Sequence, residues 1–390
     1  PATLRAGHRY SFTIGDMQAQ AQQTSEDYSD WMAYLPDNTY LSQVSIPGSH
    51  DACTIYGSHY EYKGGMPSER YHFKWLQNVV FGYMNTTKII KAQELSIEEQ
   101  LAAGVRMFDL RPSSSSSSAR DLPIHHGIAP LGDPTLGSYA PGSSGRQELS
   151  PFMLSHLLDR FVRFLDEHPG ETVLVHMKYE NTSTSANKTG WDKSVVCPLM
   201  TLADARGKIL FVIREDYKSS NNGRYFGAYL NWTHDKVVFD TTLSGNGVGQ
   251  APIRVNDLYN IKNGASDGKA KYAAIDECIA YTYNTDDPTR WCMNYVSCYD
   301  TAHCSVSGIS LFGAVGDYDY CANKYNRYTA DKIDRYDFRG NVGIVLMDFA
   351  AASHATMTYG QTYSNMQVYG DDLVRAVICN NNKWNLRRNE

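Results

Sequence analysis

Two histidines, two aspartates and an arginine in the first third of the chain have the side chains needed for acid–base chemistry on a phosphate ester. An apolar run enters a Pro-Gly turn and ends at His50 and Asp51, and such turns carry side chains to the rim of a sheet. A second apolar run ends at Asp109 and Arg111, and His126 follows it. One imidazole can take a proton, the other can return one, and a guanidinium can hold the anion.

Strand geometry predicts which of these side chains share a face. Residues two apart in a strand point the same way, which pairs Asp109 with Arg111 and His176 with Lys178, and directs Asp348 to the same side as the apolar residues two and four before it. Charged residues near the carboxyl ends of barrel strands line the mouth of the barrel. One charge at a strand end could be an ordinary solvated terminus, so the prediction depends on several strands sharing the pattern.

The histidine pair and a metal alternative need separate treatment. His125 and His126 are adjacent, so in a strand only one of them can face the mouth. The carboxylates and imidazoles of this set could also bind a divalent ion. Arg111 argues against a metal, because a fixed cation repels a second cation and can itself hold a phosphate.

Apolar runs alternate with helical patterns through most of the chain. The expected strands are 44–46, 105–111, 124–126, 172–179, 208–214, 237–239, 308–312 and 342–348. Helices are expected after a Ser150-Pro151 start, after a capping box that opens at Ser96, and over 371–378. This alternation predicts an α/β fold with a parallel sheet closed into a TIM-like (β/α) barrel, which could be distorted or incomplete.

The length of 390 residues and a hydrophobic content of 42% suit one large barrel domain over 1–390. Three segments stand apart: a polar arm with a short helix at 1–39, an aromatic-rich insertion at 52–92, and a cysteine-rich insertion at 277–330 that we expect to be a disulfide-stapled loop region. The aromatic residues could anchor the protein at a membrane interface or, more simply, pack on the flank of the barrel.

Composition narrows the partners and the compartment. The net charge of −6 without a basic block argues against nucleic acid, and no apolar run is long enough to cross a membrane. The eight cysteines do not have zinc-finger spacing. With four glycosylation sequons they favour a secreted, oxidised glycoprotein over a cytosolic protein with buried thiols; the sequons begin at Asn85, Asn181, Asn187 and Asn231.

These motifs resemble those of phosphatidylinositol-specific phospholipase C of the single-domain, bacterial (X-domain) type, a family with a TIM-like barrel. The matching segments, in chain order, are 45–51, 106–111, 124–127, 161–180, 204–214, 255–259 and 343–348. The first three are the most specific. The aromatic insertion, a serine run and the cysteine-rich segment depart from the small bacterial enzymes; they suggest a secreted fungal branch and leave substrate preference open.

The resemblance implies a role for each matched residue. His50 matches the general base that removes the proton of the inositol 2-hydroxyl, and His126 matches the general acid that protonates the leaving alkoxide. Asp348 matches the carboxylate that orients the base.

The remaining matches concern the phosphate and the inositol ring. Asp51 matches the partner of the acid and of the arginine, and Arg111 matches the phosphate clamp, which Asp109 supports. Four further residues match positions that bind inositol, the first three by hydrogen bonds and the last by stacking: Lys178, Arg214, Asp257 and Tyr259.

The family therefore implies a phosphorus–oxygen lyase or phosphodiester hydrolase that needs no metal and no cofactor and releases diacylglycerol and inositol 1,2-cyclic phosphate. The implied partners are phosphatidylinositol or its glycosylated relatives, met by a monomer in peripheral contact with a membrane. One alternative is a Ca²⁺- or Mg²⁺-dependent, sphingomyelinase D-like phosphodiesterase, which would need acidic ligands where Arg111 stands. The other is an inositol-lipid-binding module without catalysis, for which an acid–base pair has no use.

Overall fold

The structure is a computed structural model of the chain. It describes residues 27–56, 61–62, 91–112, 121–126, 129–139, 148–178, 199–214, 228–230, 232, 237–244, 249–261, 265–283, 287–300, 318–335, 340–359 and 362–383.

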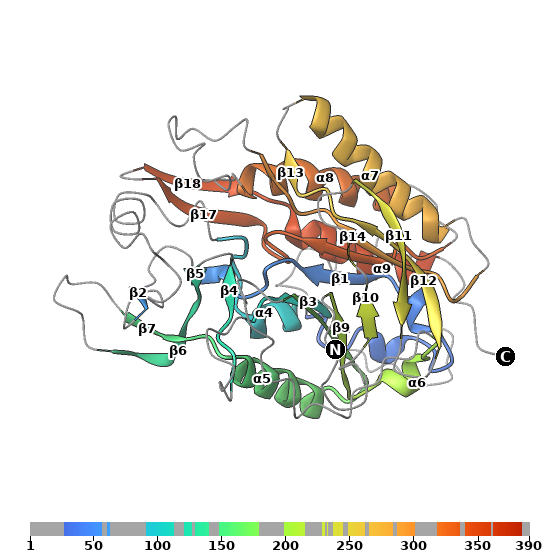
Figure 1. Cartoon of the computed structure of the whole chain (residues 1–390), viewed down its shortest axis with the longest axis horizontal. Helices are drawn as coiled ribbons and strands as arrows, with labels where there is room; N and C mark the ends of the chain where they lie inside the picture. Colours follow the sequence, from blue (N-terminus) through green and yellow to red (C-terminus); the bar gives the residue numbers. More distant parts are fainter. Residues whose placement is uncertain are drawn as a thin grey trace.

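A closed barrel forms the centre of the described chain (Figure 1). Its nine strands, in spatial order, are β1 (Ile46–Ser49), β16 (Ile344–Met347), β14 (Trp291–Tyr295), β12 (Gln250–Asn256), β11 (Phe239–Ser244), β10 (Ala228–Leu230), β9 (Ile209–Ile213), β8 (Val173–Met177) and β3 (Met107–Leu110), which pairs again with β1. Neighbouring strands are parallel except at β11, which runs antiparallel to β10 and β12. The predicted α/β, TIM-like barrel is confirmed, with β11 as its distortion.

Helices cover the outside of the barrel. They are α4 (Ile97–Ala102), α5 (Leu154–Glu167), α6 (Leu202–Ala205), α7 (Ala265–Tyr283), α8 (Tyr318–Arg335) and α9 (Gly370–Lys383), with short 3₁₀ turns η1 (Met32–Tyr34), η2 (Leu41–Gln43) and η3 (Thr54–Tyr56). Figure 1 shows α7, α8 and α9 on one side and α4, α5 and α6 on the other. Among the described residues, no helix lies between β9 and β12 in the chain.

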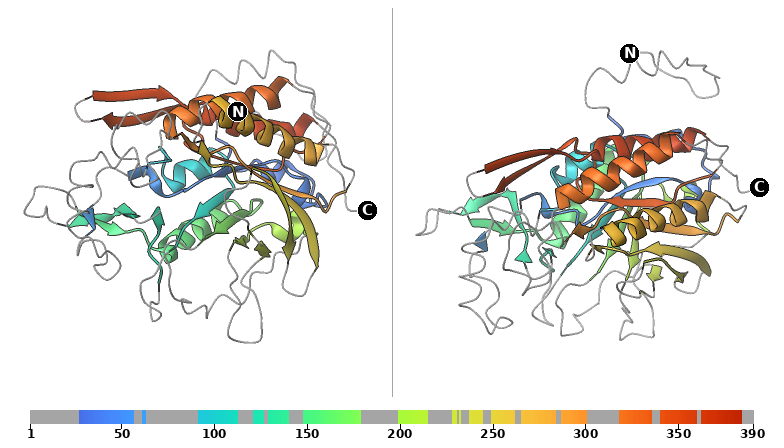
Figure 2. Two further views of the ribbon diagram at one scale, coloured as in Figure 1. Left: turned by 45° about the horizontal axis from the view of Figure 1, so that its top comes forward. Right: turned by 90° about the horizontal axis from the view of Figure 1, so that it is seen from above.

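Small sheets extend the carboxyl-terminal end of the barrel. β4 (His125–His126) pairs with β5 (Ala129–Pro130), and β17 (His354–Tyr359) pairs with β18 (Thr362–Gln367). β6 (Gly132–Tyr139), β7 (Glu148–Pro151) and β2 (Glu61–Tyr62) form a three-stranded sheet, and β13 (Asn260–Ile261) pairs with β15 (Tyr299–Asp300). Figure 2 shows the β17–β18 hairpin and the β6–β7 strands projecting from the same end of the molecule.

Local sequence signals were reliable at some helix ends and not at others. The capping box is present as predicted, with the Ser96 side chain bonded to the Glu99 N–H and the Glu99 carboxylate bonded back to Ser96. The helix expected to begin at Pro151 begins at Leu154 instead, because residues 148–151 pair with β6 as strand β7. The closing helix is longer than predicted, from Gly370 to Lys383.

Several strand predictions need correction. Residues 124–126 were expected to be a strand of the barrel, but His125 and His126 pair with β5 in a separate antiparallel sheet. Strands β12 and β14 were not predicted, because Pro252 interrupts one pattern and the buried Asn294 interrupts the other. The expected strand at 308–312 lies outside the described residues, as do most of the aromatic segment and residues 1–26 of the arm.

The expectation of a cysteine-rich loop insertion at 277–330 is wrong where the structure describes it. This segment holds the end of α7, the barrel strand β14 and most of α8. Cys278, Cys292 and Cys298 are buried, and the Cys292 thiol lies 3.5 Å from the Cys278 carbonyl oxygen. These cysteines pack as small apolar side chains, and disulfide staples remain a prediction.

Candidate active site

His50 and Asp348 meet because their strands are parallel neighbours. Ser49 of β1 pairs with Met347 of β16, so the next residue of each strand emerges at the same level of the rim. The Nδ1 atom of His50 lies 2.8 Å from Oδ1 of Asp348. A carboxylate can only accept, so Nδ1 carries the hydrogen and Nε2 keeps its lone pair.

Arg111, just beyond β3, joins three acidic or basic groups of the site. Its Nε lies 2.7 Å from Oδ1 of Asp51, and its Nη2 lies 3.0 Å from Oδ2 of Asp109. The same Nη2 lies 3.0 Å from Nε2 of His50. Asp51 can reach the guanidinium because the chain turns sharply after β1 and holds Asp51 at φ 45°, a left-handed conformation that aspartate tolerates better than most residues.

The second imidazole approaches the same carboxylate from β4. Nε2 of His126 lies 3.3 Å from Oδ2 of Asp51, and Nε2 of His50 is also 3.3 Å from that oxygen. The hydroxyl of Tyr318, at the start of α8, is 3.4 Å from Nε2 of His126. His125 is buried and its backbone N–H donates to the Arg111 carbonyl; of the two adjacent histidines, His126 is the one whose Nε2 lies beside Asp51.

Burial and neighbouring charges shift the pKa values in opposite directions. Burial lowers the pKa of His50, but the Asp51 and Asp348 carboxylates outweigh it and raise the pKa above its usual value. Burial raises the pKa of Asp348 more than the adjacent His50 lowers it. For Asp109, burial is opposed by Arg111 and by a hydrogen bond from His176, and its pKa falls well below the usual range.

Residues expected to bind a polar ring lie along the rim beyond β8, β9 and β12. Nη2 of Arg214 is 3.4 Å from Oδ2 of Asp257. The backbone N–H of Lys178 donates to the Leu110 carbonyl, which places it beside the end of β3. Tyr259 follows Asp257 by two residues, and its ring centroid lies 5.9 Å from that of Tyr299. The structure therefore brings Arg214 and Asp257 into direct contact. It places Lys178 just after β8 and Tyr259 shortly after β12.

Trp232 is a rim residue that sequence reasoning missed. Its indole N–H donates to Oδ2 of Asp257 at 2.7 Å, and the Arg214 guanidinium carbon lies 4.0 Å from the centre of its ring. The indole thus contacts both members of this ion pair. Trp232 stands inside a sequon in the sequence, which directs attention to glycosylation and away from the site.

Gln93 was also missed, and it holds the ends of β1 and β16 together. Its Nε2 donates to the carbonyl oxygens of His50, at 2.6 Å, and Met347, at 3.1 Å. Its Oε1 accepts from the backbone N–H of Ala350 at 2.8 Å. No pattern in the sequence distinguishes this glutamine, because its partners are backbone atoms far away in the chain.

Lys271 of α7 plays a similar part behind β12 and β14. Its side chain is fully buried, and Nζ donates to the carbonyl oxygens of Leu258, Tyr295 and Ser297 at 2.6–2.8 Å. Burial lowers the pKa of this lysine. The ammonium group fixes the backbone from which several rim residues project.

The site contains donors that could bind a divalent ion. One ligand atom each from His50, Asp51 and Asp109 lies within 4.8 Å of the others. Arg111 contacts all three residues at 2.7–3.0 Å. A metal bound to this set would have to displace the guanidinium, so the residues present fit an arginine-held anion better than a cation.

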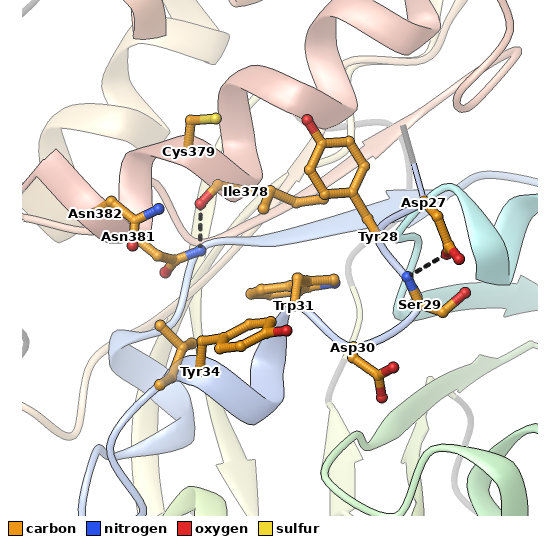
Figure 3. Close-up of a pocket in the computed structure, with 11 residues that line it drawn as sticks. Asp27, Tyr28, Ser29, Asp30, Trp31, Tyr34, Ile378, Cys379, Asn381 and Asn382 are labelled. Atoms are coloured by element: carbon orange, nitrogen blue, oxygen red, sulfur yellow. Dashed lines mark hydrogen bonds between the residues drawn. The ribbon is translucent and has the colours of Figure 1, made fainter. Parts of the chain in front are cut away.

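A separate pocket of about 370 Å³ (Figure 3) adjoins the residue before β1 and so lies at the amino-terminal end of that strand. Trp31 and Asn381 line it; the Trp31 indole donates to the Gly104 carbonyl, and the Asn381 amide bonds to Ser45, just before β1. This amino-terminal face of a barrel ordinarily serves stability.

Among the described helices, none has the length and apolar character needed to cross a bilayer.

Curated relatives match the chain at low identity. No family model matches it. It is 27% identical to the 1-phosphatidylinositol phosphodiesterase of Staphylococcus aureus strain Newman over 385 residues, 92% of this chain and 95% of the relative. The protein of the same description from Listeria monocytogenes is 26% identical over 50% of this chain and 53% of the relative. PI-PLC X domain-containing protein 3 of Danio rerio is 33% identical over 38% of this chain and 44% of the relative.

The chain therefore spans about half the length of the last two relatives and nearly all of the first. Among solved structures, the phosphatidylinositol-specific phospholipase C of S. aureus superposes with a TM-score of 0.58 at 19% identity, covering 90% of this chain and 98% of that one. The Listeria monocytogenes enzyme superposes with a TM-score of 0.54 at 21% identity over 91% and 99%. These similarities show that the barrel fold is shared.

Proposed function

We infer that this chain, which belongs to the phosphatidylinositol-specific phospholipase C family, is an enzyme that cleaves the phosphodiester of phosphatidylinositol. We propose an intramolecular transfer that releases diacylglycerol and inositol 1,2-cyclic phosphate. The observation that supports this reaction is the placement of two imidazoles, each 3.3 Å from one oxygen of Asp51, beside the Arg111 guanidinium.

His50 serves as the general base in this proposal. Its Nε2 lone pair takes the proton from the inositol 2-hydroxyl as the 2-oxygen attacks the adjacent phosphorus. The Asp348 carboxylate, 2.8 Å from Nδ1, holds the ring in the required tautomer and stabilises the imidazolium that forms. The nucleophile belongs to the substrate, so the enzyme needs no activated serine or cysteine.

Arg111 and His126 act on the phosphate and on the leaving group. The guanidinium donates to phosphoryl oxygens, on which negative charge builds up in the transition state. As the general acid, His126, whose Nε2 lies 3.3 Å from Oδ2 of Asp51, donates a proton to the diacylglycerol oxygen as the phosphorus–oxygen bond breaks. The proton taken by His50 and the proton lost by His126 balance, and solvent restores both imidazoles.

The reaction proposed here requires no metal ion. The support is the position of Arg111 among the three residues that could otherwise bind one. A metal-dependent phosphodiesterase on the same barrel is the rival, and the spacing of those three residues is the observation in its favour.

The setting of the enzyme is also a proposal. The eight cysteines and four sequons support a secreted glycoprotein, and we propose that it acts as a monomer. The substrates would be phosphatidylinositol or its glycosylated relatives, reached by peripheral contact with a membrane. The β17–β18 hairpin and the β6–β7 strands extend the end of the barrel that carries the site, which gives that contact a surface.

The test is to incubate the protein with phosphatidylinositol in EDTA and follow the products by phosphorus NMR. We expect the resonance of a five-membered cyclic phosphate to appear first. Activity that vanishes in EDTA and returns with Ca²⁺ would support the metal-dependent rival. Binding of the lipid in calorimetry without turnover would support a binding module.

A further inference from the structure

The imidazole of His176 lies inside the barrel, one layer of side chains below the rim. His176 of β8 pairs in register with Asp109 of β3, and Lys178, two residues later, shares its face at the rim. The ring is fully buried. None of the proton transfers proposed above uses it.

The neighbours of His176 determine which of its nitrogens carries the hydrogen. Nδ1 lies 2.9 Å from Oδ1 of Asp109 and 2.8 Å from the Tyr295 hydroxyl oxygen. Asp109 is ionised, because Arg111 and the hydrogen bond from His176 together outweigh burial and hold its pKa well below the usual range. Its carboxylate must accept from Nδ1–H. Burial lowers the pKa of His176, so the ring is neutral and Nε2 is a bare acceptor.

This acceptor has no hydrogen-bond partner within the part of the chain that the structure describes. Buried polar atoms are nearly always paired, and leaving one unpaired is unfavourable. The ring of His176 is 5.5 Å from that of Trp232, centroid to centroid, and Trp232 contacts Arg214 and Asp257. The imidazole that carries this acceptor therefore adjoins the residues assigned to the inositol ring.

We propose that Nε2 of His176 accepts a hydrogen bond from one hydroxyl of the inositol ring and thereby helps to select the head group. This inference rests on the proposed function and adds to it a residue for specificity. A free hydroxyl supplies the donor that Nε2 lacks. A phosphate ester at the same ring position supplies only acceptors and a second negative charge near Asp109, so lipids phosphorylated there are excluded.

The substitution His176→Asn separates the two sides of the ring. The asparagine amide keeps an N–H near the position of Nδ1, within reach of Asp109, and removes the atom at Nε2. We would measure kcat/KM on a soluble alkyl phosphodiester of inositol and on its monodeoxy analogues. On the parent substrate we expect a loss of about 10- to 100-fold, mainly through KM, the size expected for one lost hydrogen bond.

The diagnostic result is the absence of additivity at one ring position. For one deoxy analogue, the wild type should already be slower by the same factor, and His176→Asn should lose nothing more. An equal loss on the parent and on every analogue would overturn the proposal and assign His176 to holding Asp109 or a buried water. A wild type that cleaves no inositol phosphodiester would instead refute the proposed function.

Two further variants keep the test decisive. His176→Gln places an amide near the position of Nε2 but loses the contact with Asp109. The value of kcat/KM should therefore fall both on the parent substrate and on the diagnostic deoxy analogue, while the ratio of the two values stays that of the wild type. His168 forms a similar pair with Asp30, 2.9 Å apart, away from the site. His168→Asn is the matched control, and its kcat/KM should equal that of the wild type on all substrates.

Discussion

Replacing Arg111 by lysine tests the phosphate clamp most directly. The guanidinium contacts Asp51, Asp109 and His50 at 2.7–3.0 Å from two different nitrogens. Lysine keeps the charge but offers one nitrogen, which cannot reach both carboxylates and a phosphoryl oxygen together. We therefore expect Arg111→Lys to reduce the rate much more than the stability.

The two effects can be estimated separately. Losing one charged hydrogen bond costs about 1.5–3 kcal/mol of unfolding free energy, against a total of about 5–15 kcal/mol for a typical domain. The variant should therefore stay folded at 25 °C. Losing one donor to the developing charge should lower kcat by about 10²–10³-fold, and unfolding cannot account for a loss of that size.

The assay is kcat on a soluble inositol phosphodiester in EDTA, together with urea unfolding of the same preparation. Arg254→Lys is the matched control, because Arg254 likewise contacts carboxylate oxygens through two nitrogens, here both oxygens of Asp240 at 2.7 and 2.8 Å, outside the site. We expect its kcat to be unchanged. A wild-type kcat in Arg111→Lys would remove the clamp from the mechanism, and a rate loss that only tracks loss of folded protein would make Arg111 purely structural.

Four other substitutions probe the same site. His50→Ala and His126→Ala should each lower kcat by about 10²–10⁴-fold with circular dichroism unchanged, and wild-type turnover in either would refute its role. Asp348 raises the pKa of His50, and His50 must be neutral to act as the base. Asp348→Asn should therefore lower that pKa and move the acidic limb of the kcat/KM–pH profile to lower pH. An acidic limb that stays in place would show that this limb does not report the titration of His50. Gln93→Leu removes the side chain that pairs with the buried His50 carbonyl and Ala350 N–H, each worth about 1–3 kcal/mol, whereas the Met347 carbonyl keeps its bond from the His50 N–H. Urea unfolding should therefore show a loss of about 2–6 kcal/mol, and a loss below about 1 kcal/mol would contradict the bridging role.

The residues to which we assign the reaction were recognisable from short segments. His50 with Asp51, and Asp109 with Arg111, stand at the ends of apolar runs. Strand periodicity places Asp109 and Arg111 on the same face of their strand. The structure brings all four together with His126 and, on the neighbouring strand, Asp348. The local signal was sufficient because a strand end positions a side chain through only a few adjacent residues.

The less regular parts of the barrel were not recognisable in this way. β12 and β14 contain a proline or a buried asparagine, and β11 runs against its neighbours. Those features are tolerated through contacts across the sheet, such as the 2.9 Å bond from the Asn256 amide to Asn294 Oδ1. A pattern read along one strand cannot report a bond to another.

The amino-acid sequence alone determined the chemical groups, the faces on which they emerge and the α/β character of the fold, since each follows from neighbours in the chain. Only the tertiary structure decided that Gln93, Lys271, Trp232 and His176 support or line the site. Their partners are backbone carbonyls and side chains from distant elements, such as the Met347 carbonyl, 254 positions from Gln93. Such partners become neighbours only when the barrel closes, because closure sets the register between strands.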